Sequence, residues 1–154
     1  MATVMLKTAF ILCAAAAALA AQQTKKTCSL LTKAEIQQAI GVAVADGIPN
    51  KDMDSCRFQA PDGVGMVVLT ASRDTSADSA KKVAAAKQLN KNSKFRDLAN
   101  LGDCAILIET AYVGPQVSIF RGADNLLISV MAFGDTPKVS AAAEALARKA
   151  FSRF

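Results

Sequence analysis

The sequence predicts an α+β fold: one mainly antiparallel sheet of five strands with three helices on its two faces, in the order α-β-β-α-β-β-β-α. Short turns separate neighbouring apolar segments, which favours antiparallel pairing of consecutive strands. Two strand segments, 105–108 and 126–128, are apolar on both faces and need cover on both sides of the sheet. An apolar stripe with the period of a helix ends the chain. We expect a single domain over residues 28–154.

The first predicted helix spans residues 33–40. Thr32 and Glu35 have the spacing of a capping box, in which each side chain accepts a hydrogen bond from the backbone N–H of the other residue. Gly41 supplies the left-handed residue that ends a helix. Residues 42–54 carry turn signals and are expected to form a loop.

A hairpin and a second helix follow. Strands are predicted at 56–60 and 66–72, joined by the turn at 61–63. A helix is predicted over 74–89, and its apolar side is expected to carry Ala77, Ala80, Val83 and Ala84.

The second half of the chain begins with a polar loop at 90–101 and contains three predicted strands, at 104–110, 117–121 and 126–133. The last helix starts with Thr136 as N-cap and Pro137 at its first position. Its apolar stripe has the spacing of a helix side that packs on a sheet: Val139, Ala142, Ala143, Leu146, Ala147 and Ala150.

Residues 1–20 have the organisation of a signal peptide: Lys7, an apolar stretch at 9–19, and small residues at the cleavage positions of 18–20. The apolar stretch is shorter than the roughly 20 residues that cross a bilayer. Residues 21–27 are polar and are expected to form a flexible leader.

These features predict a periplasmic or secreted protein, cut near Ala20, with no transmembrane segment in the mature chain. Bulky residues precede Cys13, which is unlike the small-residue motif that precedes a lipid-attachment cysteine. We therefore expect no lipid anchor.

The composition excludes several classes of function. The chain has no histidine, so it lacks the usual general base at neutral pH and the commonest metal ligand. Its net charge of +5 is spread along the chain, with no tryptophan and one tyrosine. Nucleic-acid binding is not expected, because it usually combines a basic patch with stacking aromatic residues. The lysines of the second helix are interpreted as a solvated face.

Three motifs carry a family resemblance: Cys28-x-Leu-Leu-Thr-x-x-Glu-Ile with Gly41, Cys56-x-Phe58, and Leu101-Gly-Asp103-x-Ala105. They resemble a family of small exported bacterial proteins, often lipoproteins, of unknown function, with a fold similar to the PsbP-like α/β/α sandwich. The resemblance implies a disulfide between the two early cysteines. The chain departs from the family by lacking a lipid-attachment cysteine and by carrying Cys104 within the third motif.

Cys28, Cys56 and Cys104 remain after removal of the signal peptide, an odd number for an exported chain. A bridge between Cys28 and Cys56 would fasten the first helix to the sheet, whereas a redox pair would favour a Cys-x-x-Cys turn. Cys104 begins an apolar strand and is expected to be unpaired and buried.

The acidic spacing Asn50-x-Asp52-x-Asp54 is similar to the start of a calcium loop. The rest of that motif is missing, because Ser55 stands at the glycine position and Pro61 at the closing acid. We therefore predict a solvated turn and no metal site.

Two further sets of residues were weighed as sites. Asp103 and Glu109 would lie roughly 20 Å apart along a strand, which is too far for paired acid–base catalysis. Tyr112, Phe120 and Phe133 are possible ligand-facing residues at the sheet edge, although core packing is the commoner role of such side chains.

The sequence therefore predicts an exported, non-catalytic binding module for an envelope protein or a small apolar ligand. It predicts no catalytic residue, metal or cofactor and leaves the oligomeric state open. The alternatives are a carboxylate-based or thiol-based enzyme of unknown substrate and a purely structural or inhibitory envelope protein, which the sequence does not separate from the binding module. Several polar side chains converging in a cleft would favour the enzyme, and a broad apolar patch would favour partner binding.

Overall fold

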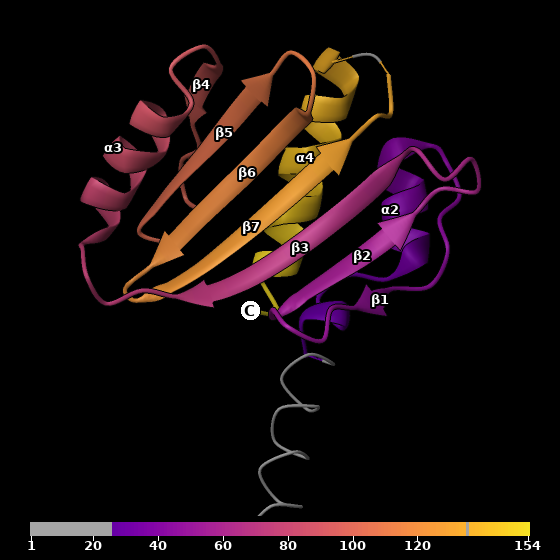
Figure 1. Cartoon of the computed structure of the whole chain (residues 1–154), viewed down its shortest axis with the longest axis horizontal. Coiled ribbons are helices and arrows are strands. Elements are labelled where there is room, and N and C mark those ends of the chain that lie inside the picture. Colours follow the sequence, from indigo (N-terminus) through magenta and orange to yellow (C-terminus); the bar gives the residue numbers. More distant parts are fainter. Residues whose placement is uncertain (1–25, 135) are drawn as a thin grey trace, which may run out of the picture.

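The computed structural model describes residues 26–134 and 136–154, which form one antiparallel sheet with helices on both faces (Figure 1). The predicted signal peptide lies outside the described residues. The strand order across the sheet is β1-β2-β3-β7-β6-β5-β4. The seven strands are β1 (Ile48–Pro49), β2 (Ser55–Gln59), β3 (Met66–Arg73), β4 (Lys94–Asp97), β5 (Cys104–Thr110), β6 (Gly114–Arg121) and β7 (Asp124–Met131). The described residues also contain four helical segments: the turn at 26–28, α2 (Lys33–Ile40), α3 (Ser79–Leu89) and α4 (Thr136–Phe151).

The helices are divided unequally between the two faces. The main core lies between the sheet and the helices α2 and α4. A smaller cluster lies under α3, where Val83 and Ala86 pack on Ile106 and Ile108 of β5. The predicted cover on both faces is thus confirmed. None of the helices in the described ranges combines the length and apolarity needed to cross a membrane.

The first predicted helix is confirmed with its bounds, because α2 spans Lys33–Ile40. The backbone N–H of Glu35 donates to Oγ1 of Thr32 at 3.3 Å, and the N–H of Thr32 donates to Oε2 of Glu35 at 2.9 Å. Gly41 ends the helix with φ of 82°. The stripe of α4 is also confirmed, since its six predicted core residues are all buried.

The prediction of five strands is wrong, because β1 and β4 add one strand at each edge of the sheet. β1 has only two residues, one of them Pro49, and lies within the predicted loop at 42–54. β4 has the sequence Lys-Phe-Arg-Asp and lies within the predicted polar loop at 90–101. Both are edge strands, where charged residues and proline are tolerated and apolar alternation is not required.

The second helix was predicted too long and in the wrong phase. α3 begins at Ser79, after the N-cap Asp78, whose side chain accepts from the backbone N–H of Lys81 at 2.8 Å. Ala80 and Ala84, predicted on the apolar side, are exposed, whereas Lys82, predicted in solvent, is buried.

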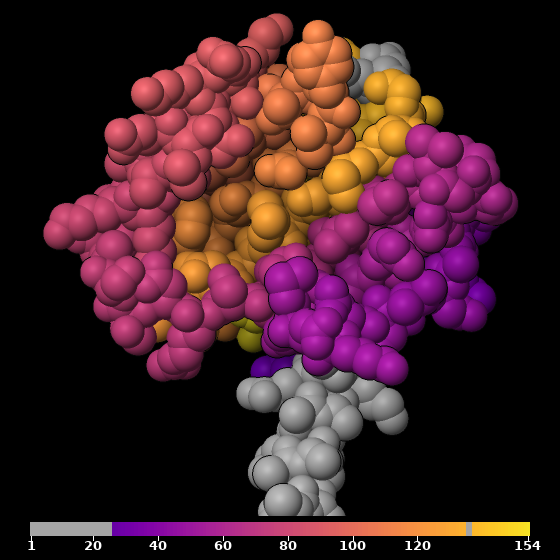
Figure 2. Space-filling model, viewed as in Figure 1, coloured from indigo at the N-terminus to yellow at the C-terminus, as the bar shows by residue number. Residues whose placement is uncertain are grey.

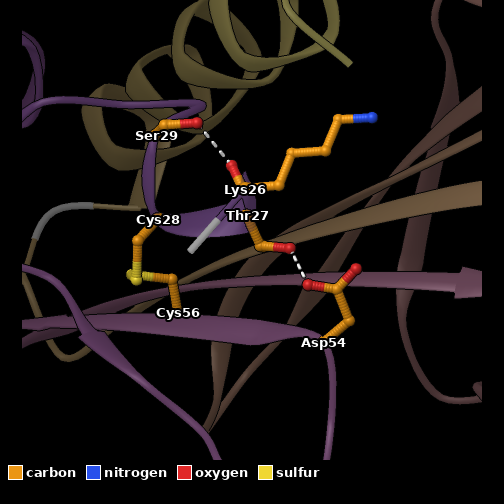
Figure 3. Close-up of a disulfide and its surroundings, with 6 residues drawn as sticks. All are labelled: Lys26, Thr27, Cys28, Ser29, Asp54 and Cys56. Atoms are coloured by element: carbon orange, nitrogen blue, oxygen red, sulfur yellow. Dashed lines mark hydrogen bonds between the residues drawn. A yellow bond between two sulfur atoms is a disulfide. The ribbon is translucent and has the colours of Figure 1, made fainter. Parts of the chain in front are cut away.

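The predicted disulfide joins Cys28 to Cys56, with the two Cα atoms 5.0 Å apart (Figure 3). It fastens the helical turn at 26–28 to β2. The predicted leader overlaps the described residues only at Lys26 and Thr27, which belong to this turn. Thr27 is buried and donates from its hydroxyl to the carboxylate of Asp54 (Figure 3).

Candidate binding face

Three central strands of the sheet present a side that no helix of the described part of the chain covers fully. We call this side the open face. It consists of Met66, Val68 and Thr70 of β3, Leu127, Ser129 and Met131 of β7, and Gln116 and Ser118 of β6. The register places Val68 opposite Ser129 and Leu127 opposite both Thr70 and Ser118, so these side chains form one continuous surface.

Strand alternation produces the open face. Successive side chains of a strand point to opposite sides of the sheet. In β3 the alternate residues Val67 and Leu69 are fully buried under α2 and α4, and in β7 Leu126 and Ile128 are buried in the same core. The residues between them are therefore directed to the α3 side, where α3 stands over β5 and the Phe120 end of β6 rather than over the rest of β6, β7 and β3.

The open face is uncharged and mostly half-buried. It mixes aliphatic and methionine side chains with hydroxyls and one amide, and none of its eight residues is ionisable. Ser129 is buried at 7% exposure, and the other seven are half-buried. The surface is hollowed in this region, between α3 and the strands β3 and β2 (Figure 2). A hollow of this composition is suited to apolar contact supplemented by neutral hydrogen bonds.

Lys82 fixes α3 at one end of the open face. Its side chain is 8% exposed, and its ammonium donates to the carbonyl of Asp74 at 2.6 Å and to that of Gly122 at 3.1 Å. A third contact, at 3.4 Å, reaches the side-chain oxygen of Asn125 in β7. One buried cation therefore joins α3 to the loop before it, to the β6–β7 turn and to β7.

Beyond Lys82, the flank of α3 that faces the open face carries apolar side chains. Lys87 donates to Asp97 of the edge strand β4, whereas Lys82 reaches Asn125 of β7, so the two lysines lie on opposite flanks of the helix. Ala85 and Leu89 follow Lys82 at helical spacings of three and seven residues and share its flank. Leu89 is a large apolar side chain with 85% exposure.

The strand β2 forms the opposite rim of the open face. Its outer edge is hydrogen-bonded to residues 45–50 of the same chain. The N–H of Ala45 donates to the carbonyl of Gln59 at 2.8 Å, and the N–H of Asn50 donates to that of Ser55 at 2.9 Å. Between them Ile48 pairs with Arg57. The backbone along this edge is therefore occupied by the chain itself, and the exposed Arg57 is the nearest charge to the face on this side.

The three predicted ligand-facing aromatic residues lie in separate surroundings. Tyr112 is 99% exposed on the β5–β6 turn, and Phe120 is buried in the cluster under α3. Phe133 packs against the main core on the other side of the sheet. These residues therefore line no common pocket, and none belongs to the open face.

The single described thiol outside the disulfide is Cys104, and it is half-buried rather than fully buried as predicted. It stands at the start of β5 opposite Phe120. The adjacent Asp103 accepts from the hydroxyl of Ser79, the first residue of α3, so Cys104 lies near the start of that helix.

The acidic residues weighed as catalytic candidates have structural partners. Asp103 accepts from the backbone N–H of Gly122 at 2.6 Å and from the hydroxyl of Ser79 at 3.3 Å. Glu109 accepts from the buried hydroxyl of Ser140, in a shallow pocket of about 400 Å³ between α4 and the edge of the sheet. The two carboxylates thus lie at opposite ends of β5 and accept hydrogen bonds from different elements.

Glu35 and Glu144, two of the carboxylates with arginine partners, also stabilise the fold. Hydrogen bonds from the Arg153 guanidinium lower the pKa of Glu35 from 4.5 to about 2, despite the opposing effect of burial. The Arg148 side chain, followed by Arg96, lowers the pKa of Glu144. Both acids are therefore ionised at neutral pH and tie the last helix to its neighbours.

The acidic turn at 50–54 also has a structural arrangement. The side-chain oxygen of Asn50 accepts from the backbone N–H of Asp52 at 2.8 Å, and the carboxylate of Asp54 holds Thr27. Across the described residues no group of three or more acidic or cysteine side chains is arranged as a metal site.

The residues that carry the family resemblance have structural places away from the open face. Cys28 and Cys56 form the disulfide, Thr32 and Glu35 form the capping box, and Asp103 holds the β6–β7 turn. They indicate how the chain folds rather than what it binds. The resemblance itself stays a prediction, because comparison with protein families, with curated proteins and with solved structures finds no match to this chain.

Proposed function

We propose that this protein is an exported, non-catalytic module that binds a partner protein through the open face. The observation that carries the proposal is an uncharged, half-buried surface of eight side chains on a chain whose other surfaces are rich in ion pairs. Partly apolar, concave surfaces of this kind are typical of interaction sites.

Export is supported by the signal-peptide pattern of residues 1–20 and by the Cys28–Cys56 disulfide. Disulfides persist in oxidising compartments and are rare in reducing ones. A protein partner is favoured over a small ligand because the open face is broad and bounded on two sides, whereas small-molecule sites usually enclose most of their ligand. The structural partners of the acidic residues favour binding over carboxylate catalysis.

The test is affinity capture from the exported fraction of the native cells with three forms of the protein. Leu127→Lys places a charge in the centre of the open face, and Ala34→Lys places the same charge on the exposed side of α2. We expect a protein captured equally by the wild type and Ala34→Lys and at least tenfold less by Leu127→Lys.

Circular dichroism and the melting temperature verify that Leu127→Lys is folded. Val68→Lys, a second change on the same face, repeats the test if Leu127→Lys is not folded. Equal capture by all three forms would overturn the proposal. A small molecule that native mass spectrometry finds on the wild type and not on Leu127→Lys would replace the protein partner by a ligand.

A further inference from the structure

We propose that the partner occupies the open face with an α-helix that lies alongside α3. This inference rests on the proposed function and specifies its partner. The helical layer on this side of the sheet stops halfway, because α3 packs through Val83 and Ala86 over β5 and β6. Within the described ranges no second helix continues the layer over β7 and β3. On the other side of the sheet two helices, α2 and α4, share the cover.

Backbone hydrogen bonding favours a helix over an extended peptide. The strands β3, β7 and β6 are each paired on both sides, and residues 45–50 occupy the outer edge of β2. An extended peptide gains most of its affinity by pairing with a free strand edge. Laid across the open face it would meet only side chains, and its own N–H and C=O groups would lack partners. A helix satisfies these groups internally.

The dimensions of the open face match one helix. Three strands spaced about 4.8 Å apart make a surface roughly 10–14 Å wide, and a helix with its side chains is about 10–12 Å across. β3 and β7 each have eight residues. The open face takes up five of these residues along each strand, which is roughly 16 Å at about 3.3 Å per residue and corresponds to about three turns of helix.

The chemistry of the surroundings defines the side of the helix that packs. The open face presents the apolar side chains of Val68 and Leu127 and the hydroxyls of Ser118 and Ser129. The flank of α3 beside it adds the exposed Leu89. A charge brought onto the centre of this surface, away from Arg57 at its rim, would lose water without gaining a counterion. The packing side of the partner helix therefore carries small and aliphatic residues at spacings of three and four, with charged residues confined to its outer side.

The test is a selection with two displayed libraries on the purified, oxidised protein. One library presents a helix of about three turns randomised on one side, and the other presents unconstrained linear peptides. We expect binders from the helical library, with apolar and small residues on the randomised side. Their affinity should fall at least tenfold for Leu127→Lys and for Leu89→Asp, and stay unchanged for Ala34→Lys. Leu89 is 85% exposed, so its substitution tests the contact with α3 without disturbing the core.

Three results would overturn the proposal that the partner binds with a helix. The first is enrichment from the linear library alone, and the second is equal affinity of the helical binders for the wild type and Leu127→Lys. The third is a dimer in sedimentation equilibrium that Leu127→Lys dissociates, which would make a second copy the occupant. If neither library yields binders while capture from cells still depends on Leu127, the helix is wrong and the binding face stands. If capture does not depend on Leu127, the proposed function itself fails.

Discussion

Loss of the Cys28–Cys56 disulfide is expected to lower the free energy of unfolding by about 3.5 kcal/mol. The bridge joins residues separated by 28 positions, and closing a loop of that length in the unfolded chain removes conformational entropy worth about 3.5 kcal/mol at 25 °C. The closed loop contains α2 and β1, and the buried Leu30 follows the bridge almost directly. In a domain of this size, the loss corresponds to a fall in melting temperature of about 10–15 °C.

The assay is calorimetric and urea unfolding of the wild type and of the double variant Cys28→Ala/Cys56→Ala. Reduction of the wild type provides a second measurement that leaves the sequence unchanged. Cys104→Ala is the matched control, because this cysteine lies outside the bridge and its loss should cost less than about 1 kcal/mol. A loss below about 1 kcal/mol in the double variant, or an equal loss in the control, would refute the reasoning.

Three further predictions concern single side chains. Lys82→Met should destabilise the protein by about 1–3 kcal/mol, since the partly buried carbonyls of Asp74 and Gly122 lose their donor. Thermal unfolding should show a loss of less than about 0.5 kcal/mol for the exposed control Lys81→Met, and equal effects of the two changes would contradict a stabilising role of Lys82. Glu35→Gln should cost about 1–2 kcal/mol at pH 7. The pKa of Glu35 is lowered by Arg153 to about 2, so its contribution is present above pH 4.5 and lost as the pH falls toward 2; a difference between wild type and variant that persists at pH 2 would contradict this. Cys104 should react slowly with iodoacetamide in the native, oxidised protein and fully after unfolding, by peptide mapping; label on Cys28 before reduction would contradict the disulfide.

Local signals in the sequence were sufficient where an element is stabilised by its own residues. The capping box of Thr32 and Glu35 and the stop at Gly41 lie within the ten residues that define α2. The six-residue stripe of α4 and the apolar run of β5 likewise need no distant partner to be recognised. These elements have the predicted places, and β5 has the predicted bounds.

Edge strands were missed because each is defined by its pairing with the next strand and carries no strand pattern of its own. β4 has Phe95 as its one apolar residue, and its pairing is determined by β5, whose Ile108 stands opposite. β1 exists because two residues lie beside Arg57 and Cys56 of β2. Nothing within either segment distinguishes it from a polar loop.

The phase of α3 differs from the predicted one because Lys82, expected in solvent, is buried. The stem of Lys82 packs under the helix, and its ammonium finds oxygen atoms in Asp74, Gly122 and Asn125. Those acceptors come from two loops and a strand that only the folded chain brings together. Long amphipathic side chains can bury their stems in this way whenever the charged end finds polar partners.

The open face could not be predicted from the strands alone, since half-buried and fully buried sides of a strand differ only in what covers them. The side chains on the α3 side of the sheet nevertheless differ between the part that α3 covers and the part that it does not. Under α3 the sheet presents Ile106 and Ile108. Where α3 does not reach, the same side of the sheet presents Leu127 between two hydroxyl residues, Thr70 and Ser118. This mixed apolar and hydroxyl composition is the observation that supports the proposed binding face.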